Sequence, residues 1–186
     1  MDRRVLKTKE AIMKAFVELI AEKNFEQVTI NEIAERANVN RGTVYLHYVD
    51  KLDLLDQCIE AYLTQLFESC MPAEDTAQPS AKTLILRTFK YLEQHAFIYT
   101  TLLTSKGVPT FRNRLMEGMQ QGIEDHLDMS GINQDMNKEI MVQFLTSAAI
   151  GLLEWWIIRS MPYPAEDIVE QLWTLLERHH IFPEPA

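Results

Sequence analysis

Residues 40–47, which read Asn-Arg-Gly-Thr-Val-Tyr-Leu-His, place several hydrogen-bonding side chains on one short segment. A guanidinium such as that of Arg41 can donate two hydrogen bonds to the O6 and N7 atoms of guanine, and hydroxyl and imidazole groups bind base edges or phosphates. Glycine inside a helix is costly, so Gly42 favours a site where the backbone approaches a partner closely. These residue types at this spacing indicate recognition of a nucleic acid.

Two short helices joined by a tight turn are needed to present this segment. Thr29 followed three residues later by Glu32 is a capping-box pattern, so we expect a first helix to begin at Thr29. Asn38 tolerates a left-handed backbone and ends that helix. Asn40 then caps a second helix, whose inward positions are Val44 and the residue four places later, Tyr48. The other side chains of the second helix face outward.

This pattern resembles the N-terminal domain of tetracycline-repressor (TetR) family transcription regulators over about residues 8–56. The spacing of Tyr45, His47 and Lys51 is far more specific than a bare helix-turn-helix pattern. Asn24 and Asn38 stand where the family usually has glycine, and both can adopt positive φ, though less readily than glycine. The resemblance implies DNA contacts by Thr29, Asn31, Asn40, Arg41, Gly42, Thr43, Tyr45, His47 and Lys51.

Each of these roles has a plainer alternative. Arg41 at a surface can bind phosphate instead of a base, and Gly42 can be a neutral substitution. Lys51 combines an ammonium group with the start of a fourth helix, and both attract phosphate. Asn31, on the supporting helix, is a weaker candidate, and Tyr48 fits the core better than a DNA contact.

Composition agrees with a folded protein of one or two small domains. The chain has 186 residues, of which 47% are hydrophobic and 24% charged. It has no run of about 18 apolar residues and no apolar signal segment at its start, so we expect a cytoplasmic protein without a membrane span. Cys58 and Cys70 are too far apart along one helix for a disulfide and are expected to be reduced thiols.

The charge is unevenly distributed. Residues 1–51 hold nine Lys and Arg against eight acidic residues, whereas the remainder holds nine against nineteen. An acidic body would be repelled from DNA, which favours docking through the N-terminal end. The basic residues Arg3, Arg4, Lys7 and Lys9 can form a mobile arm that contacts DNA, or they can be ordinary solvated charges.

Helical periodicity runs along the whole chain, which predicts an all-α fold of about nine helices. We expect a helix-turn-helix DNA-binding domain over residues 1–51 and a helical effector-binding and dimerisation domain over residues 52–186. Thr8 can cap the first helix, which then runs to about Lys23. Residues 71–79 contain two prolines and no periodicity, so they are expected to form a linker.

Aromatic and sulfur-containing side chains in the C-terminal part can line a small-molecule pocket, as the resemblance implies. The same helical spacing also suits a plain core. No enzyme motif is present, so no catalytic residue, metal site or cofactor is predicted. The candidate pocket residues are Tyr91, His95, Tyr99, Phe111, Met116, Met119, Met141, Phe144 and Trp155.

The resemblance implies a homodimer paired through helices near 137–160 and 164–178, bound to a palindromic double-stranded operator. The expected function is repression that a small molecule relieves. With few cations in the C-terminal part, we expect this effector to be uncharged or cationic and partly aromatic or aliphatic. An alternative is an interaction protein that recruits a partner through its acidic body, and a helical enzyme is a third class that lacks paired catalytic groups.

Overall fold

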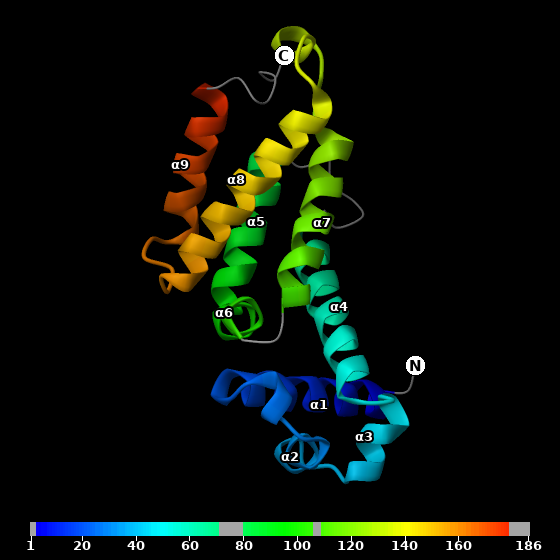
Figure 1. Cartoon of the computed structure of the whole chain (residues 1–186). Helices are drawn as coiled ribbons and strands as arrows, with labels where there is room; N and C mark the ends of the chain where they lie inside the picture. The colour runs from blue at the N-terminus through cyan, green and yellow to red at the C-terminus, as the bar shows by residue number, and fades with distance from the viewer. Residues whose placement is uncertain (1–2, 71–79, 106–108, 179–186) are drawn as a thin grey trace. The chain divides into compact units, whose positions relative to one another are not determined.

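The computed structural model describes residues 3–70, 80–105 and 109–178, and every regular element in these ranges is helical. The all-α fold expected from the sequence is confirmed. Two short 3₁₀ turns, η1 (Phe25–Gln27) and η2 (Gly131–Asn133), accompany the α-helices. The nine α-helices of the described residues (Figure 1) are α1 (Arg3–Glu22), α2 (Ile30–Arg36), α3 (Arg41–His47), α4 (Lys51–Cys70), α5 (Ala81–Gln94), α6 (Ala96–Thr104), α7 (Pro109–His126), α8 (Lys138–Ile158) and α9 (Ala165–Arg178).

The helices group into two compact units. The N-terminal unit comprises residues 1–65 together with 97–111, and the C-terminal unit comprises residues 66–96 together with 112–186. Helix α4 continues without a break through the expected functional boundary at residue 51, and that boundary stays a prediction. The linker expected at residues 71–79 lies outside the described residues.

Helix α1 supplies the core of the N-terminal unit. Its buried face includes Ile12, Phe16 and Ile20, and it packs on α2. The Phe16 and Phe25 rings meet edge to face with centroids 6.1 Å apart. The expectation that Thr8 caps this helix was wrong, because α1 already begins at Arg3. Thr8 lies inside the helix, where its hydroxyl donates to the carbonyl oxygen of Arg4 at 2.9 Å.

The turn between α2 and α3 forms as predicted from local residues. Thr29 and Glu32 make the reciprocal capping box at the start of α2. Asn38 adopts a φ of 52°, and the Val39 N–H reaches back to the carbonyl of Ala34 at 2.9 Å, which closes the end of α2. Asn24, the other residue for which positive φ was considered, has a φ of −60° and precedes η1 instead.

Helix α6 comes from the middle of the chain but belongs to the N-terminal unit. The Tyr99 hydroxyl donates to the carbonyl of Tyr62 on α4 at 2.9 Å. The Ser105 hydroxyl, directly after α6, donates to the carbonyl of Ile20 on α1 at 3.1 Å. Two long helices of the unit are therefore tied to α6 by side chains that bind their backbones.

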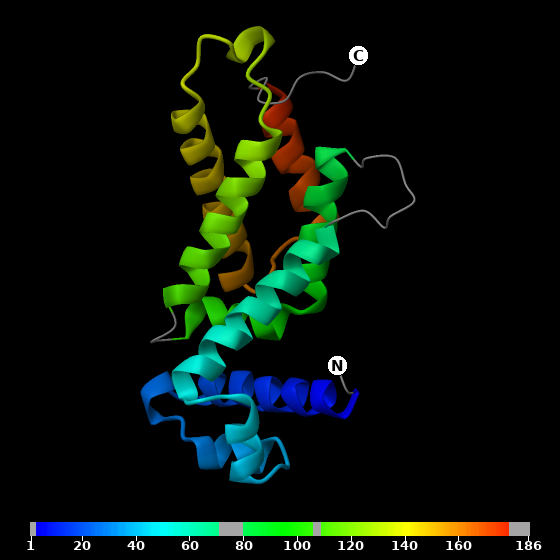
Figure 2. The ribbon, with the colours of Figure 1, turned by 90° about the vertical axis from the view of Figure 1, so that its right-hand side faces the viewer.

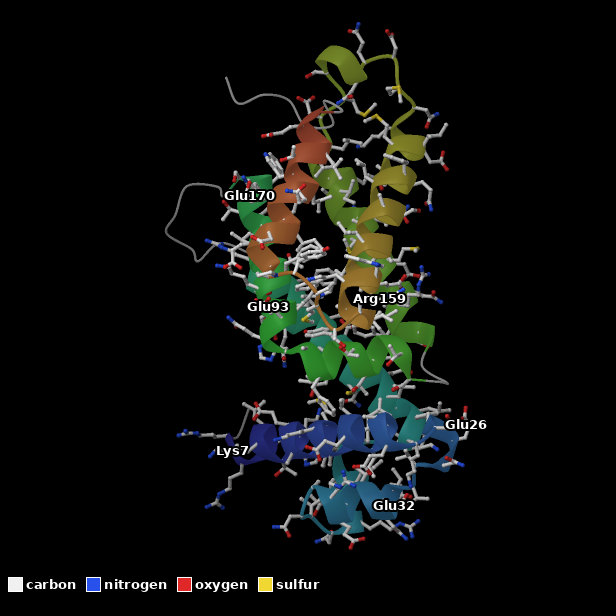
Figure 3. All side chains as sticks on the ribbon, turned by 90° about the vertical axis from the view of Figure 1, so that its left-hand side faces the viewer. Lys7, Glu26, Glu32, Glu93, Arg159 and Glu170 are labelled. Carbon is white, nitrogen blue, oxygen red and sulfur yellow. The ribbon has the colours of Figure 1, made fainter. Side chains whose placement is uncertain are left out.

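In the C-terminal unit, α9 lies beside α5 (Figures 1 and 2). The Phe89 ring of α5 contacts the ring of buried Trp156 with centroids 5.0 Å apart. Glu170 of α9, labelled in Figure 3, pairs with Lys82 of α5 at 2.8 Å. This ion pair is exposed and contributes little. Ala165, Ile168 and Val169 of α9 are buried, so apolar burial accounts for most of the packing of α9.

Helix α8 begins after its cap Asn137 and is strongly apolar. Although the sequence has no unbroken apolar run of about 18 residues, α8 is long and apolar enough to cross a membrane by length and composition. No other helix among the described residues meets that condition. The core helix of a water-soluble protein has the same length and composition, and 44% of this segment is buried within the protein.

Candidate nucleic-acid interface and apolar cavities

Helix α3 presents one face to the core and the opposite face to the outside. Val44 is 0% exposed and Tyr48, which follows the helix, is 2% exposed, so both inward positions predicted from the sequence are confirmed. Arg41, Tyr45 and Leu46 are exposed. Arg41 and Tyr45, two of the hydrogen-bonding side chains predicted to read DNA, are therefore presented to the outside by a helix that is anchored through Val44.

Arg41 and Tyr45 form a pair one turn apart on α3. An Arg41 Nη2–H donates to the Tyr45 hydroxyl at 3.2 Å, and the guanidinium lies 5.4 Å from the centre of the ring. An exposed contact of this kind stabilises by about 0.5–1 kcal/mol, enough to bias the direction of a long side chain. Together with Thr29, Ile30 and Asn31 of the supporting helix, the pair lines a shallow depression of about 170 Å³.

Two predicted contact residues are engaged in capping α3. The Asn40 side-chain oxygen accepts hydrogen bonds from the Thr43 N–H at 2.8 Å and from the Thr43 hydroxyl at 3.0 Å. The Asn40 amide NH₂ remains a donor. The two residues therefore hold the first turn of α3, and a DNA contact by either one stays a prediction.

Thr29 is engaged in the same way at the start of α2. Its hydroxyl donates to Glu32 at 2.8 Å, and its backbone N–H donates to the same carboxylate at 3.0 Å. Glu32 also accepts a hydrogen bond from Lys23. The hydrogen bonds from Lys23 and Thr29 lower the pKa of Glu32 to about 2. The start of α2 is thus held by a network that keeps Glu32 ionised.

Gly42 has a structural reason to lack a side chain. A Cβ at this position would lie 3.2 Å from the Asn40 side-chain oxygen, the atom that caps α3. The close approach of DNA suggested by the sequence remains a prediction, since the cap alone already favours glycine here. His47 lies in the last turn of α3, half-buried, with its ring edge-on to Tyr48 at 6.3 Å between centroids.

The Lys51 ammonium is engaged within the protein. Its ammonium donates to the carbonyls of Phe25 at 2.8 Å, Glu26 at 3.2 Å and Val28 at 2.9 Å, and it lies 4.4 Å from the centre of the Phe25 ring. An ammonium has three donors, so this arrangement occupies all of them. In this structure Lys51 therefore ties α4 to the segment around η1, and its phosphate contact stays a prediction.

The expected basic N-terminal arm is also corrected. Arg3, Arg4, Lys7 and Lys9 all lie within α1, so they are part of a helix. Lys7 is exposed (Figure 3). Lys9 donates to the side chain of Gln57 on α4 at 3.1 Å and lies 5.5 Å from the centre of the Tyr48 ring. The sequence missed this because the residues before Thr8 lack a capping signal.

Two apolar cavities lie within the C-terminal unit, with volumes of about 370 and 440 Å³. Both fall in the range typical of small-molecule sites. The first is lined mainly by α5, α7, α8 and α9, and the second by α4, α5, α7 and α8. Five residues line both cavities, which are therefore neighbours: Ile85, Thr88, Met119, Ile123 and Leu153.

Of the nine predicted pocket residues, Met119 and Phe144 line these cavities. The other seven do not. Tyr91 packs on His95 with ring centroids 4.3 Å apart. Tyr99 and Phe111 are buried together in the N-terminal unit. Met116 is half-buried, Met141 belongs to a small core cluster with Leu127, and Trp155 stacks on Tyr163.

Aliphatic residues form most of the cavity walls. Their spacing in the sequence is the same as that of aliphatic residues in a core without a cavity. A usable signal was the pair Gly118 and Gly122, one turn apart on α7, because two glycines weaken a helix by about 0.5–1 kcal/mol each. Both line the larger cavity. A Cβ at Gly118 would meet the Phe67 ring at 2.4 Å, whereas one at Gly122 would meet nothing within 4 Å.

Few polar groups face the cavities. Thr88 lines both, and its hydroxyl lies 2.8 Å from the Cys70 sulfur in the wall of the larger one. Both cysteines are unpaired, as expected. Burial raises the pKa of Cys58 to about 12, which keeps it a thiol. A molecule inside these cavities would therefore be held chiefly by apolar contacts.

A helix-turn-helix with an exposed hydrogen-bonding face defines a class of DNA-binding regulators. Two family models extend this assignment over most of the chain. Residues 12–58 match the bacterial regulatory proteins of the tetR family, and residues 80–178 match a transcriptional regulator C-terminal region of the same group. The chain belongs to the TetR family of transcriptional regulators, and the family is one of regulators and not of enzymes.

Individual relatives agree with this assignment. The chain is 37% identical to the fatty acid metabolism regulator protein of Bacillus subtilis, covering 82% of this chain and 84% of that protein. It is 42% identical to the repressor BepR of Brucella suis over 52 residues, which is 28% of this chain and 25% of BepR. The chain spans about half the length of the first curated relatives it matches.

A solved structure also shares the fold. The regulator FadR of Bacillus subtilis, determined in complex with stearoyl-CoA, superposes with a TM-score of 0.64. The match covers 90% of this chain and 96% of that one at 20% identity. Such a likeness confirms the helical architecture of this chain.

Proposed function

We propose that this protein is a sequence-specific DNA-binding repressor that leaves a palindromic operator when an apolar effector fills the cavities of its C-terminal unit. The observation that carries the proposal is the exposed Arg41–Tyr45 pair on α3, held by a capped turn beside Asn31. These groups suit base edges and phosphates in a major groove. The name of BepR supports repression as the direction of control.

The proposed DNA contacts differ in kind. Arg41 is assigned to a guanine, because its guanidinium extends from the first turn of the reading helix. Tyr45, Thr43 and His47 are assigned to phosphates or base edges around it, with Asn31 and the Asn40 amide as supporting donors. Lys51 is assigned a positioning role, since its ammonium is occupied by three carbonyls.

A homodimer completes the proposed function, because its two α3 helices can bind two half-sites about 34–36 Å apart or a multiple of that. Helix α8 carries an exposed stripe with large apolar residues at its ends, including Ile140 (65% exposed) and Phe144 (63% exposed). Small exposed residues, Ser147, Ala148 and Gly151, lie in the middle of the stripe. Covering this stripe with the same helix of a second copy removes an apolar patch from water.

The proposed effector carries a long hydrocarbon chain, such as the fatty acyl group of an acyl-CoA, whose anionic coenzyme A part differs from the uncharged or cationic effector expected from the sequence. The two neighbouring cavities have nearly apolar walls, which match such a chain better than a sugar or a phosphate. The regulator of fatty acid metabolism and the FadR complex with stearoyl-CoA support this class. Helices α4 and α6 connect the C-terminal unit to the helix-turn-helix along the chain. Movement of these helices on ligand binding would therefore alter the affinity for DNA.

Because the proposed target is DNA, we propose that the protein acts in the cytoplasm.

Selection of genomic fragments with the purified protein, followed by titration at several salt concentrations, tests the proposed DNA binding. We expect one palindromic sequence to be enriched and its affinity to fall steeply with salt. Enrichment of no common sequence would contradict it.

The effector is tested separately by melting and by release of the selected DNA. Stearoyl-CoA should raise the melting temperature in proportion to the logarithm of its concentration and weaken operator binding, whereas coenzyme A alone should do neither. The effector class would be wrong if phosphorylated sugars, and no acyl compound, changed both melting and DNA affinity.

A further inference from the structure

One exposed side chain on the reading helix cannot form hydrogen bonds. Leu46 lies in the last turn of α3 and is 81% exposed, the most exposed of the large hydrophobic residues among the described positions. Its neighbour Tyr45, by contrast, is tied to Arg41. Single exposed leucines are common on protein surfaces, but this one projects from the helix proposed to enter the major groove, where an apolar group of the DNA can cover it.

Helix geometry places Leu46 at the centre of the exposed face. An α-helix turns by about 100° per residue, so Gly42 and Leu46 each lie about 160° from Val44 around the helix axis. Val44 is buried, and the direction opposite to it points away from the protein. Gly42 has no side chain, so Leu46 is the side chain that projects furthest along this direction.

The chemical groups on the floor of a major groove determine what Leu46 can contact in DNA. Donors and acceptors of the bases suit Arg41 and the hydroxyl groups, whereas the apolar group of the groove is the C5 methyl of thymine. Leu46 directly follows exposed Tyr45 on the same helix, so its surface adjoins the proposed DNA interface. We infer that Leu46 reads a thymine methyl in each operator half-site, an inference that rests on the proposed function.

The helix also predicts where that thymine lies. Leu46 follows Arg41 by five residues, which is about 7.5 Å along the axis at 1.5 Å per residue. At 100° per residue the two side chains also point about 140° apart around the axis, so they reach the groove in different directions. The thymine read by Leu46 is therefore expected at a base pair other than the one read by Arg41.

Replacing single thymines of the selected operator by deoxyuridine removes only the methyl group and tests this inference. The wild-type protein should bind about fourfold more weakly for each half-site changed at the critical thymine, from about 0.8 kcal/mol per buried methyl-sized group. Leu46→Ala should bind the thymine and deoxyuridine duplexes equally. Leu52→Ala, the same change at a residue 60% exposed in the first turn of α4, is the matched control and should keep the wild-type ratio.

The possible failures are distinguishable. If no thymine in the operator responds to loss of its methyl, or if Leu46→Ala keeps the response, the inference is overturned while DNA binding stands. If no operator is enriched at all, the proposed function fails and the inference fails with it. Leu46 is exposed, so unchanged melting of Leu46→Ala separates a reading defect from a folding defect.

Discussion

Arg41 is the residue at which base reading and charge attraction can be told apart. Its guanidinium is exposed and oriented by Tyr45, so it can form two hydrogen bonds to guanine as well as one ion pair with phosphate. Lysine carries the same charge on a flexible stem but lacks the planar pair of donors. A comparison of the two side chains therefore distinguishes the roles.

Arg41→Ala should weaken binding to the operator by about 1–3 kcal/mol and relax the preference at one base pair. Arg41→Lys should recover part of the affinity but not the preference. Titration against operators with each base pair changed measures both quantities. Full recovery of affinity and preference by lysine would assign Arg41 to a phosphate.

Lys51→Met keeps the length of the side chain and removes its ammonium. The carbonyls of Phe25, Glu26 and Val28 then lose a charged donor, so the free energy of unfolding should fall by about 1–3 kcal/mol. Denaturation with urea measures the loss, and Lys7→Met, at an exposed lysine of α1, is the control and should change little. The salt dependence of DNA binding should stay unchanged. A slope lower by about one unit would show that Lys51 contacts a phosphate after all.

The stability of a short helix depends on the residues that cap its ends. Helix α2 has seven residues, too few to be stable without its caps and its packing on α1. Helix α7 shows the opposite case, because its two glycines weaken the helix where the larger cavity lies. In both elements, local residues decide how well the helix supports its site.

The capping box of α2 should make stability depend on pH. Since the pKa of Glu32 is about 2 in the folded protein, its contribution is fully present above its unfolded pKa of about 4.3 and is lost as the pH falls towards 2. Glu32→Gln removes the titrating group but can still accept the capping hydrogen bonds. The difference in unfolding free energy between the two proteins should therefore shrink from pH 6 to pH 2. A constant difference over this range would contradict the assignment.

Gly122→Leu should add a side chain at the wall of the larger cavity, where a Cβ meets nothing within 4 Å. A leucine side chain displaces about three methylene groups of a bound acyl chain, so ligand binding should weaken by about 2–3 kcal/mol. Melting with stearoyl-CoA measures this loss, and operator binding should persist. Gln121→Leu adds the same side chain at the adjacent exposed position and is the control. Unchanged ligand binding in Gly122→Leu would place the acyl chain elsewhere.

The proposed dimer would bring two α3 helices to the operator, and the exposed stripe of α8 is its proposed contact surface. Its middle consists of small residues, which allow two helices to approach closely. Large apolar side chains at both ends then supply buried area. This distribution suits a symmetric contact between two copies of the chain.

We expect sedimentation at micromolar concentration to give a mass of about 43 kDa, twice that of the 21.6 kDa chain. Gly151→Glu places a charge in the middle of the stripe, where a Cβ meets no neighbour within the chain, and should yield a folded monomer. Thr64→Glu, at an exposed position of α4, is the control and should remain dimeric. A wild-type monomer at this concentration, or a dimer of Gly151→Glu, would contradict the interface.

Neighbouring residues are enough to predict the local features of the helix-turn-helix. Thr29, Asn38 and Asn40 act on backbone groups within five residues, so their effect can be recognised from neighbouring positions alone. The spacing of Val44 and Tyr48 likewise determined which face of α3 is buried. For these reasons the amino-acid sequence alone predicts the helix-turn-helix, its family and its outward face.

Tertiary structure decided the features that join distant segments. The carbonyl partners of Lys51 lie 23 to 26 residues away, and no local pattern shows that its ammonium is occupied. The cavities are lined by several helices whose aliphatic residues follow the same spacing in a filled core. An empty volume is a property of how separate helices pack, and the periodicity of each helix alone does not contain it.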